Sequence, residues 1–238
     1  MTSRRAHALN ALFTLGVPLL LLLAPAAHAG RPLVTEDAGV LAARDCEWEN
    51  AALSTHQAGT PRVTELLTQI GCGFGLDNQA ALAVGRARSS GTSEHSLALL
   101  GKTGLVQAGE QGGTAWTLAW GLEGYRPAGN GLRHDLSFLN LVASRSLGAA
   151  WTGHANAGLT HSRIAGQTTA NWNLALEWAQ REGLEWMGEF YGAERSKPWL
   201  GLGVRWSPSR DWSFNASLAR QSETPQVRLL SLGFKLSF

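Results

Sequence analysis

Apolar and polar side chains alternate along most of the chain after residue 45. The clearest case is the segment 172–178 (WNLALEW), where tryptophan and leucine occupy every second position and asparagine, alanine and glutamate lie between them. Segments 116–122, 200–206, 212–218 and 228–238 repeat this pattern. A period of two is typical of β-strands, whereas a helix would repeat every 3.6 residues. The pattern therefore predicts an all-β protein.

The alternation recurs often enough to predict an antiparallel up-and-down transmembrane β-barrel of about 12 strands. An even number of strands allows both termini of the chain to lie in the periplasm, with short turns on that side and longer loops outside. Breaks such as 76–77 and 147–148 are short, whereas opposite breaks such as 57–62 and 126–133 are longer. The predicted strands are 46–55, 63–74, 78–88, 95–106, 114–125, 135–144, 149–160, 169–180, 184–193, 197–206, 211–219 and 226–238.

The aromatic residues test this arrangement, because they favour the two membrane–water interfaces. One group lies near the periplasmic end: Trp116, Trp151, Trp178, Trp186, Trp206, Trp212 and Phe238. Others lie near the external end: Phe138, Trp172 and Phe190, with Tyr125, Tyr191 and Trp199 close by on inward positions. The alternative is a soluble β-sandwich or a lipocalin-like barrel, in which the apolar face would point inward and the 10 tryptophans would fill a core.

The N-terminus has the features of a secretory signal peptide. Arg4 and Arg5 precede an apolar run over 11–24, and Ala27-His28-Ala29 forms a small-x-small cleavage site. The run is shorter than the roughly 20 residues of a spanning helix, although an uncleaved anchor is the alternative. We therefore expect a signal peptide over 1–29, a periplasmic segment over 30–44 and a barrel over 45–238, in the bacterial outer membrane after cleavage near Ala29.

The net charge and the C-terminal strand indicate which partners are expected. The formal net charge of +2 comes from the two arginines of the signal peptide, so the exported chain is formally neutral and no nucleic acid is expected to bind. The last strand alternates apolar residues from Leu230 to a terminal Phe238. This ending resembles the C-terminal signature that the barrel assembly machinery reads, so that machinery is an expected partner.

The two cysteines lie symmetrically about the turn between the first two predicted strands. Cys46 begins the first strand, Cys72 lies near the end of the second, and the midpoint between them is Gly59 in that turn. Directly opposed residues of a hairpin lie within disulfide reach, and an exported chain permits the bond. The alternatives are free thiols or metal ligands, although no nearby Cys or His completes a tetrahedral metal site.

A short motif follows the predicted cleavage site. It comprises Arg31, Pro32, Thr35, Glu36, Asp37 and Ala38, followed by Cys46 and Glu49. This motif resembles a family of bacterial outer-membrane transporters associated by name with the meta-pathway of phenol degradation. The resemblance implies a barrel, a second cysteine, a terminal Phe and transport of small, aromatic or otherwise hydrophobic solutes.

Inward positions carry most of the candidate functional residues. Those proposed to line a permeation path are Glu123, His154, Asn156, Asn173, Glu177, Glu185, Glu189, Arg205 and Lys235. They either make the interior polar, as in barrels generally, or favour cations and neutral polar-aromatic solutes. No His-x-Ser pair places a nucleophile and a base on one strand face, so we expect no enzyme and no catalytic residue. The sequence also has no phosphate loop, dinucleotide fingerprint or run of metal ligands, so we expect no metal and no cofactor.

Outward-facing basic residues suggest a lipid partner. Arg86 and Arg88 are in phase with Leu82 and Val84 at the external end of a predicted strand, so they are expected to face lipopolysaccharide phosphates. The alternative is a solvated strand end. The sequence thus predicts a passive channel for small solutes among outer-membrane lipids and lipopolysaccharide. A structural or adhesive barrel and an outer-membrane lipid-modifying enzyme are the alternative functions.

Overall fold

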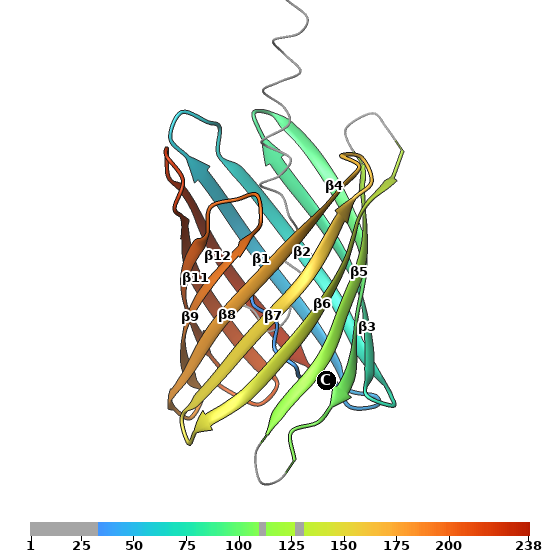
Figure 1. Cartoon of the computed structure of the whole chain (residues 1–238), viewed down its shortest axis with the longest axis vertical. Helices are drawn as coiled ribbons and strands as arrows, with labels where there is room; N and C mark the ends of the chain where they lie inside the picture. Colours follow the sequence, from blue (N-terminus) through green and yellow to red (C-terminus); the bar gives the residue numbers. More distant parts are fainter. Residues whose placement is uncertain (1–32, 110–112, 127–130) are drawn as a thin grey trace, which may run out of the picture.

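The computed structural model describes residues 33–109, 113–126 and 131–238, and within them twelve antiparallel strands form a closed barrel (Figure 1). Each strand pairs with its neighbours in sequence, and β1 closes the barrel on β12. The twelve predicted strands are therefore confirmed. They are β1 Cys46–Gln57, β2 Val63–Gly75, β3 Asn78–Ser89, β4 Thr92–Val106, β5 Thr114–Arg126, β6 Arg133–Gly148, β7 Trp151–Ser162, β8 Gln167–Arg181, β9 Leu184–Ala193, β10 Trp199–Trp206, β11 Trp212–Gln221 and β12 Val227–Ser237.

The two ends of the barrel differ. We call the end at which Cys46 and Phe238 lie the lower rim, because it is at the bottom of Figure 1, and the opposite end the upper rim. At the lower rim a two-residue turn, Leu76–Asp77, joins β2 to β3, and both of its residues have positive φ angles of 52° and 54°. This left-handed geometry is that of the tight turns that suit antiparallel hairpins.

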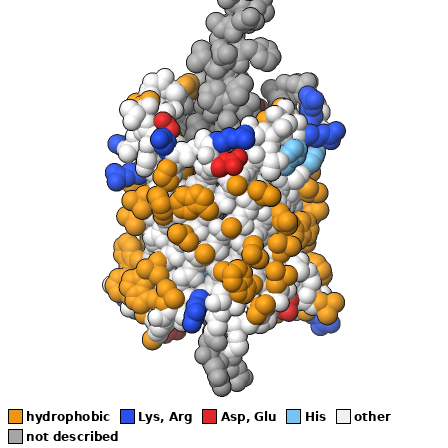
Figure 2. All heavy atoms as spheres, in the orientation of Figure 1, with side chains coloured by type: hydrophobic (Ala, Val, Ile, Leu, Met, Phe, Trp, Pro, Cys, Tyr) orange, Lys and Arg blue, Asp and Glu red, His pale blue; other side chains and the backbone are white. Residues whose placement is uncertain are grey.

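Large apolar side chains point outward and polar side chains point inward. On β10, Leu200 and Leu202 are 46% and 66% exposed, whereas the intervening Gly201 is buried. Figure 2 shows the resulting belt of hydrophobic side chains between two charged ends. A soluble sandwich or lipocalin-like barrel would have the opposite polarity, so the structure excludes both. No helix in the described part of the chain has the length and apolar character needed to cross a membrane.

Aromatic side chains pack against one another on the outer surface near the lower rim. Trp151 stacks on Trp178 with 5.8 Å between ring centroids, and Trp212 stacks on Phe234 at 6.0 Å. The external group differs from the expectation at one position. Phe138 points into the barrel. Its ring occupies the space that a side chain on inward-facing Gly121 would need.

The predicted disulfide is present. Cys46 and Cys72 are direct register partners in the β1–β2 hairpin, their Cα atoms are 4.1 Å apart and their sulfurs are bonded. The bond joins the start of β1 to β2 at the lower rim. Free thiols and metal ligation by these two cysteines are therefore excluded.

Residues 33–44 lie inside the barrel, and we call them the lumen segment. Ala38 packs with Ala119 and Val142 from the barrel wall, and Leu33, Thr35 and neighbouring residues are also buried. The sequence predicts a periplasmic segment over 30–44, between the cleavage site and the first strand of the barrel. Instead its backbone is held by polar side chains of the wall, as described below. The predicted signal peptide over 1–29 and the motif residues Arg31 and Pro32 lie outside the described residues.

Candidate functional site

The upper part of the lumen segment is held by one carboxylate of the wall. Oε2 of Glu189, on β9, accepts hydrogen bonds from the backbone N–H groups of Val34 at 2.8 Å and Thr35 at 2.9 Å. The Thr35 hydroxyl donates to the same oxygen at 3.0 Å. Glu189 and Thr35 are only 5% and 2% exposed. Hydrogen bonds to a buried charged acceptor are among the stronger ones in proteins, so this carboxylate anchors the segment.

Two asparagines continue this anchoring. Asn156 on β7 accepts a hydrogen bond from the Glu36 N–H at 2.7 Å and donates one to the Glu36 carbonyl at 2.9 Å. Its amide therefore satisfies both backbone polar groups of one residue, as a neighbouring strand would. Asn173 on β8 donates to the Val34 carbonyl at 3.4 Å. The buried backbone groups of the segment therefore have hydrogen-bond partners at these positions, although the segment lies inside the barrel.

Lys102 on β4 is the cationic contact of the lumen segment. Its ammonium donates to the Asp37 carbonyl at 2.9 Å and lies 3.3 Å from the Glu36 carboxylate and 3.7 Å from that of Asp37. Burial raises the pKa of Glu36, and the nearby Lys102 charge offsets only part of that effect. Burial also acts to raise the pKa of Asp37, but the attraction of Lys102 and the hydrogen bond from the Gly39 N–H together outweigh it, and the pKa is lowered. Lys102 thus neutralises part of the acidic motif.

The lower part of the segment contacts strands β6, β5 and β2. Ser144 accepts a hydrogen bond from the Ala38 N–H at 2.7 Å, and the Thr117 hydroxyl donates to the Ala38 carbonyl at 2.6 Å. Ala43 then forms a parallel bridge with Gly73. A side chain at Gly73 would collide with the backbone of residues 41 and 42, so glycine permits this close approach.

A charged network lies beside the segment. The Ser144 hydroxyl is 2.8 Å from Nδ1 of His154, and Nε2 of His154 is 3.8 Å from Glu177. Glu177 also pairs with Arg205 at 3.3 Å, and Arg205 bonds Glu185 at 2.7 Å. Strands β7 to β10 thus contribute one connected set of polar and charged side chains. Within the described residues, no group of three or more His, Cys, Asp or Glu side chains is arranged to hold a metal ion.

The structure divides the predicted permeation residues into separate groups. Asn156, Asn173 and Glu189 hold the lumen segment, and His154, Glu177, Glu185 and Arg205 form the adjacent network. Lys235 pairs with Glu47 at 2.7 Å near the lower rim. Glu123 is buried on β5, away from these contacts. All nine occupy inward positions, but their role in permeation stays a prediction.

The structure shows what several of the motif residues contact. Thr35, Glu36, Asp37 and Ala38 all make contacts with the wall, and Glu49 accepts a hydrogen bond from Gln69 on β2. Sequence reasoning missed Gln79, Thr117 and Ser144, which bind the segment's backbone. Their only sequence signal is a polar residue at an inward position, which does not reveal its partner.

Above the segment the lumen wall becomes aromatic. Tyr191, two residues beyond Glu189 on β9, stacks on Trp199 of β10 with 5.9 Å between centroids and 3° between the planes. Phe138 and Leu100 both cover the inner face of Gly121. Tyr191 is buried, whereas Trp199 and Phe138 are partly exposed, so the accessible aromatic surface comes from the last two.

A comparison with known protein families matches residues 18–238 to the family described as "Uncharacterised conserved protein UCP029691". The chain belongs to this family. No similar sequence was found among curated proteins.

Solved structures share the fold at low sequence identity. A KdgM porin is 10% identical and has a TM-score of 0.58, with 80% of this chain and 99% of that chain covered. The COG4313 outer membrane channel from Pseudomonas putida F1 is 12% identical with a TM-score of 0.52, covering 85% and 98%. The translocator domain of the autotransporter NalP from Neisseria meningitidis is 13% identical with a TM-score of 0.51, covering 96% of each chain. At these identities the likeness shows the barrel fold.

Proposed function

We propose that this protein is a passive outer-membrane channel for small, aromatic or otherwise hydrophobic solutes, and that the lumen segment narrows its path. The observation that carries the proposal is the inverted polarity of the barrel: an apolar outer belt surrounds a buried polar interior. Such a wall suits a bilayer outside and a solute path inside. A porin fold and a barrel-type C-terminal strand ending at Phe238 support placement in the outer membrane.

The lumen segment determines how open the path is. Barrels of about eight strands are filled by side chains, whereas those of roughly 16 to 18 strands hold aqueous channels. A barrel of twelve strands lies between these limits, and here residues 33–44 occupy part of the interior. We therefore propose a narrow path rather than a wide pore.

The preference for aromatic solutes has two supports. Trp199, which stacks on the buried Tyr191, presents a partly exposed aromatic ring on the inward face of β10. The motif over residues 31–38 resembles the outer-membrane transporters associated by name with phenol degradation. A solute with an aromatic ring would contact both the rings and the polar groups beneath them.

The enzyme alternative has one structural feature in its favour, the cross-strand trio of Ser144, His154 and Glu177. Its geometry argues against nucleophilic catalysis, because Ser144 already accepts a hydrogen bond from the Ala38 N–H and so lies beneath the lumen segment. His154 faces Ser144 with Nδ1 and Glu177 with Nε2, and Glu177 also pairs with Arg205. The trio fits a role in holding the segment.

Solute flux into liposomes tests the proposal. Phenyl β-glucoside and methyl β-glucoside form a matched pair of membrane-impermeant solutes that differ in the aromatic ring. We expect the reconstituted protein to admit both, with the phenyl compound faster. Trp199→Ala should reduce that preference several-fold, whereas Trp206→Ala, on the outer surface of the same strand, should not. Flux no greater than that of empty liposomes would overturn the channel.

A further inference from the structure

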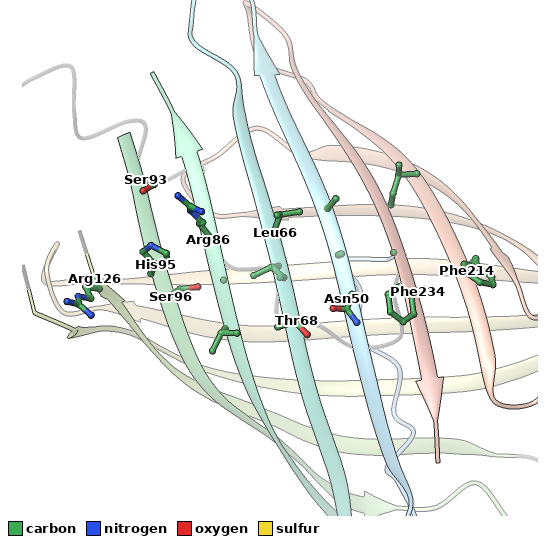
Figure 3. A pocket seen from close by; sticks show the side chains of 17 residues that line it. Asn50, Leu66, Thr68, Arg86, Ser93, His95, Ser96, Arg126, Phe214 and Phe234 are labelled. Atoms are coloured by element: carbon green, nitrogen blue, oxygen red, sulfur yellow. The ribbon is translucent and has the colours of Figure 1, made fainter. Parts of the chain in front are cut away.

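A groove runs across the outer surface of β1 to β5 and β11 to β12 (Figure 3). The groove is shallow and open, with a volume of about 1180 Å³. Exposed apolar side chains form much of its surface, including Leu66, Val84 and Leu232, and Phe214 and Phe234 form its far side. The groove belongs to the membrane-facing wall, so a molecule that binds in it must have apolar groups that contact these side chains.

Basic side chains line one side of this groove. Arg86 on β3 is the register partner of His95 on β4, and His95 is the register partner of Arg126 on β5. Figure 3 shows the three side chains beside one another on adjacent strands. Arg88 follows two residues after Arg86 on the same outward face. All four are exposed, so this side of the groove carries concentrated positive charge.

A second basic group lies on the strands that form the other side. Arg220 on β11 is the register partner of Arg228 on β12, and Arg228 is the register partner of His56 on β1. These residues are exposed and lie toward the upper rim from Leu232. Within the part of the chain that the structure describes, no carboxylate forms an ion pair with Arg86, Arg88, Arg220 or Arg228.

We propose that this groove binds the lipid A portion of a lipopolysaccharide molecule. Lipid A carries a phosphate at each end of its disaccharide and several acyl chains, which matches a groove with an apolar floor, basic side chains along one side and a second basic group beyond it toward the upper rim. Arginine suits phosphate because its planar guanidinium donates several hydrogen bonds to the phosphate oxygens. The upper rim then faces the outer leaflet, where lipopolysaccharide lies. This inference rests on the proposed outer-membrane placement, but not on conduction.

Binding of purified lipopolysaccharide to the detergent-solubilised protein, measured by native mass spectrometry, tests the site. Three paired variants separate position from charge: Arg86→Gln with Arg88→Gln, Arg220→Gln with Arg228→Gln, and, as control at the lower rim, Arg181→Gln with Arg210→Gln. Each removes two exposed positive charges. Heat-dependent migration on a denaturing gel verifies that each variant is folded. If a paired variant does not fold, the single changes Arg88→Gln and Arg228→Gln replace it in the assay.

We expect each groove pair to weaken binding by about tenfold and the control pair to leave it unchanged. Dephosphorylated lipopolysaccharide should bind the wild type no better than it binds the groove variants. Equal binding to all three paired variants would overturn the site. Equal or tighter binding of phosphatidylglycerol at the same arginines would overturn the choice of lipopolysaccharide. Because the assay needs no solute movement, its outcome is independent of whether the barrel conducts.

Discussion

Glu189 binds Thr35 through a single carboxylate oxygen, which accepts hydrogen bonds from the Thr35 backbone at 2.9 Å and from its hydroxyl at 3.0 Å. The two residues are 154 positions apart in the sequence. This contact joins a strand of the barrel wall to the segment inside it, so the Glu189 carboxylate holds the upper part of the segment. The first prediction follows from this contact.

Glu189→Ala should release the upper part of the lumen segment. The change removes three hydrogen bonds to Oε2, and a hydrogen bond to a charged group contributes about 1.5–3 kcal/mol. We expect amide hydrogen exchange at Val34 and Thr35 to become at least tenfold faster, while the strands keep their protection. Glu194→Ala, at an exposed position beyond the same strand, is the matched control. Equal exchange in both variants would contradict the anchoring role.

Lys102→Met should also destabilise the segment, because it leaves the buried Glu36 carboxylate without its cationic partner. Removing one member of a buried ion pair costs about 3–5 kcal/mol. We expect faster exchange of the amides of residues 36–39. Adding Glu36→Gln should restore part of the lost protection, since the uncompensated charge is then gone. Additive effects of the two changes would show that the residues do not interact.

The sequence predicts the wall of the barrel better than its interior. Strand positions follow from alternation within each segment, and the Cys46–Cys72 bond follows from the symmetry of one hairpin, so both are local signals. Inward phase likewise identified Glu189 and Asn156 as lumen residues. What each inward residue touches depends on the closed barrel, which brings strands distant in sequence around one axis.

The lumen segment is the main difference between expectation and structure. Residues 33–44 are short and aperiodic, a pattern that is equally compatible with a loop in water. Their burial comes from side chains such as Lys102, Thr117 and Ser144, which lie on three different strands. Phe138 shows a related limit: it shares the inward phase of Asn140 and Val142 on β6, and its large ring fits inside because the neighbouring residue across the strands is Gly121.

Loss of the disulfide should weaken the β1–β2 hairpin without opening the barrel. Cys46 and Cys72 are separated by 26 positions, and closing a loop of this length stabilises a fold by about 3 kcal/mol. We expect Cys46→Ser with Cys72→Ser to lower the temperature at which the heat-dependent gel shift occurs. Reduced wild-type protein should behave like the variant. An unchanged transition temperature in both samples would show that the bond does not limit unfolding.

Single-channel conductance in planar bilayers tests most directly the central claim that this barrel is a channel narrowed by residues 33–44. We predict small, discrete conductance steps for the wild type and for Glu194→Ala, and steps at least severalfold larger for Glu189→Ala, whose lumen segment has lost its main anchor. Absence of steps in all three folded proteins would contradict the channel. Equal steps in all three would contradict the role of the lumen segment.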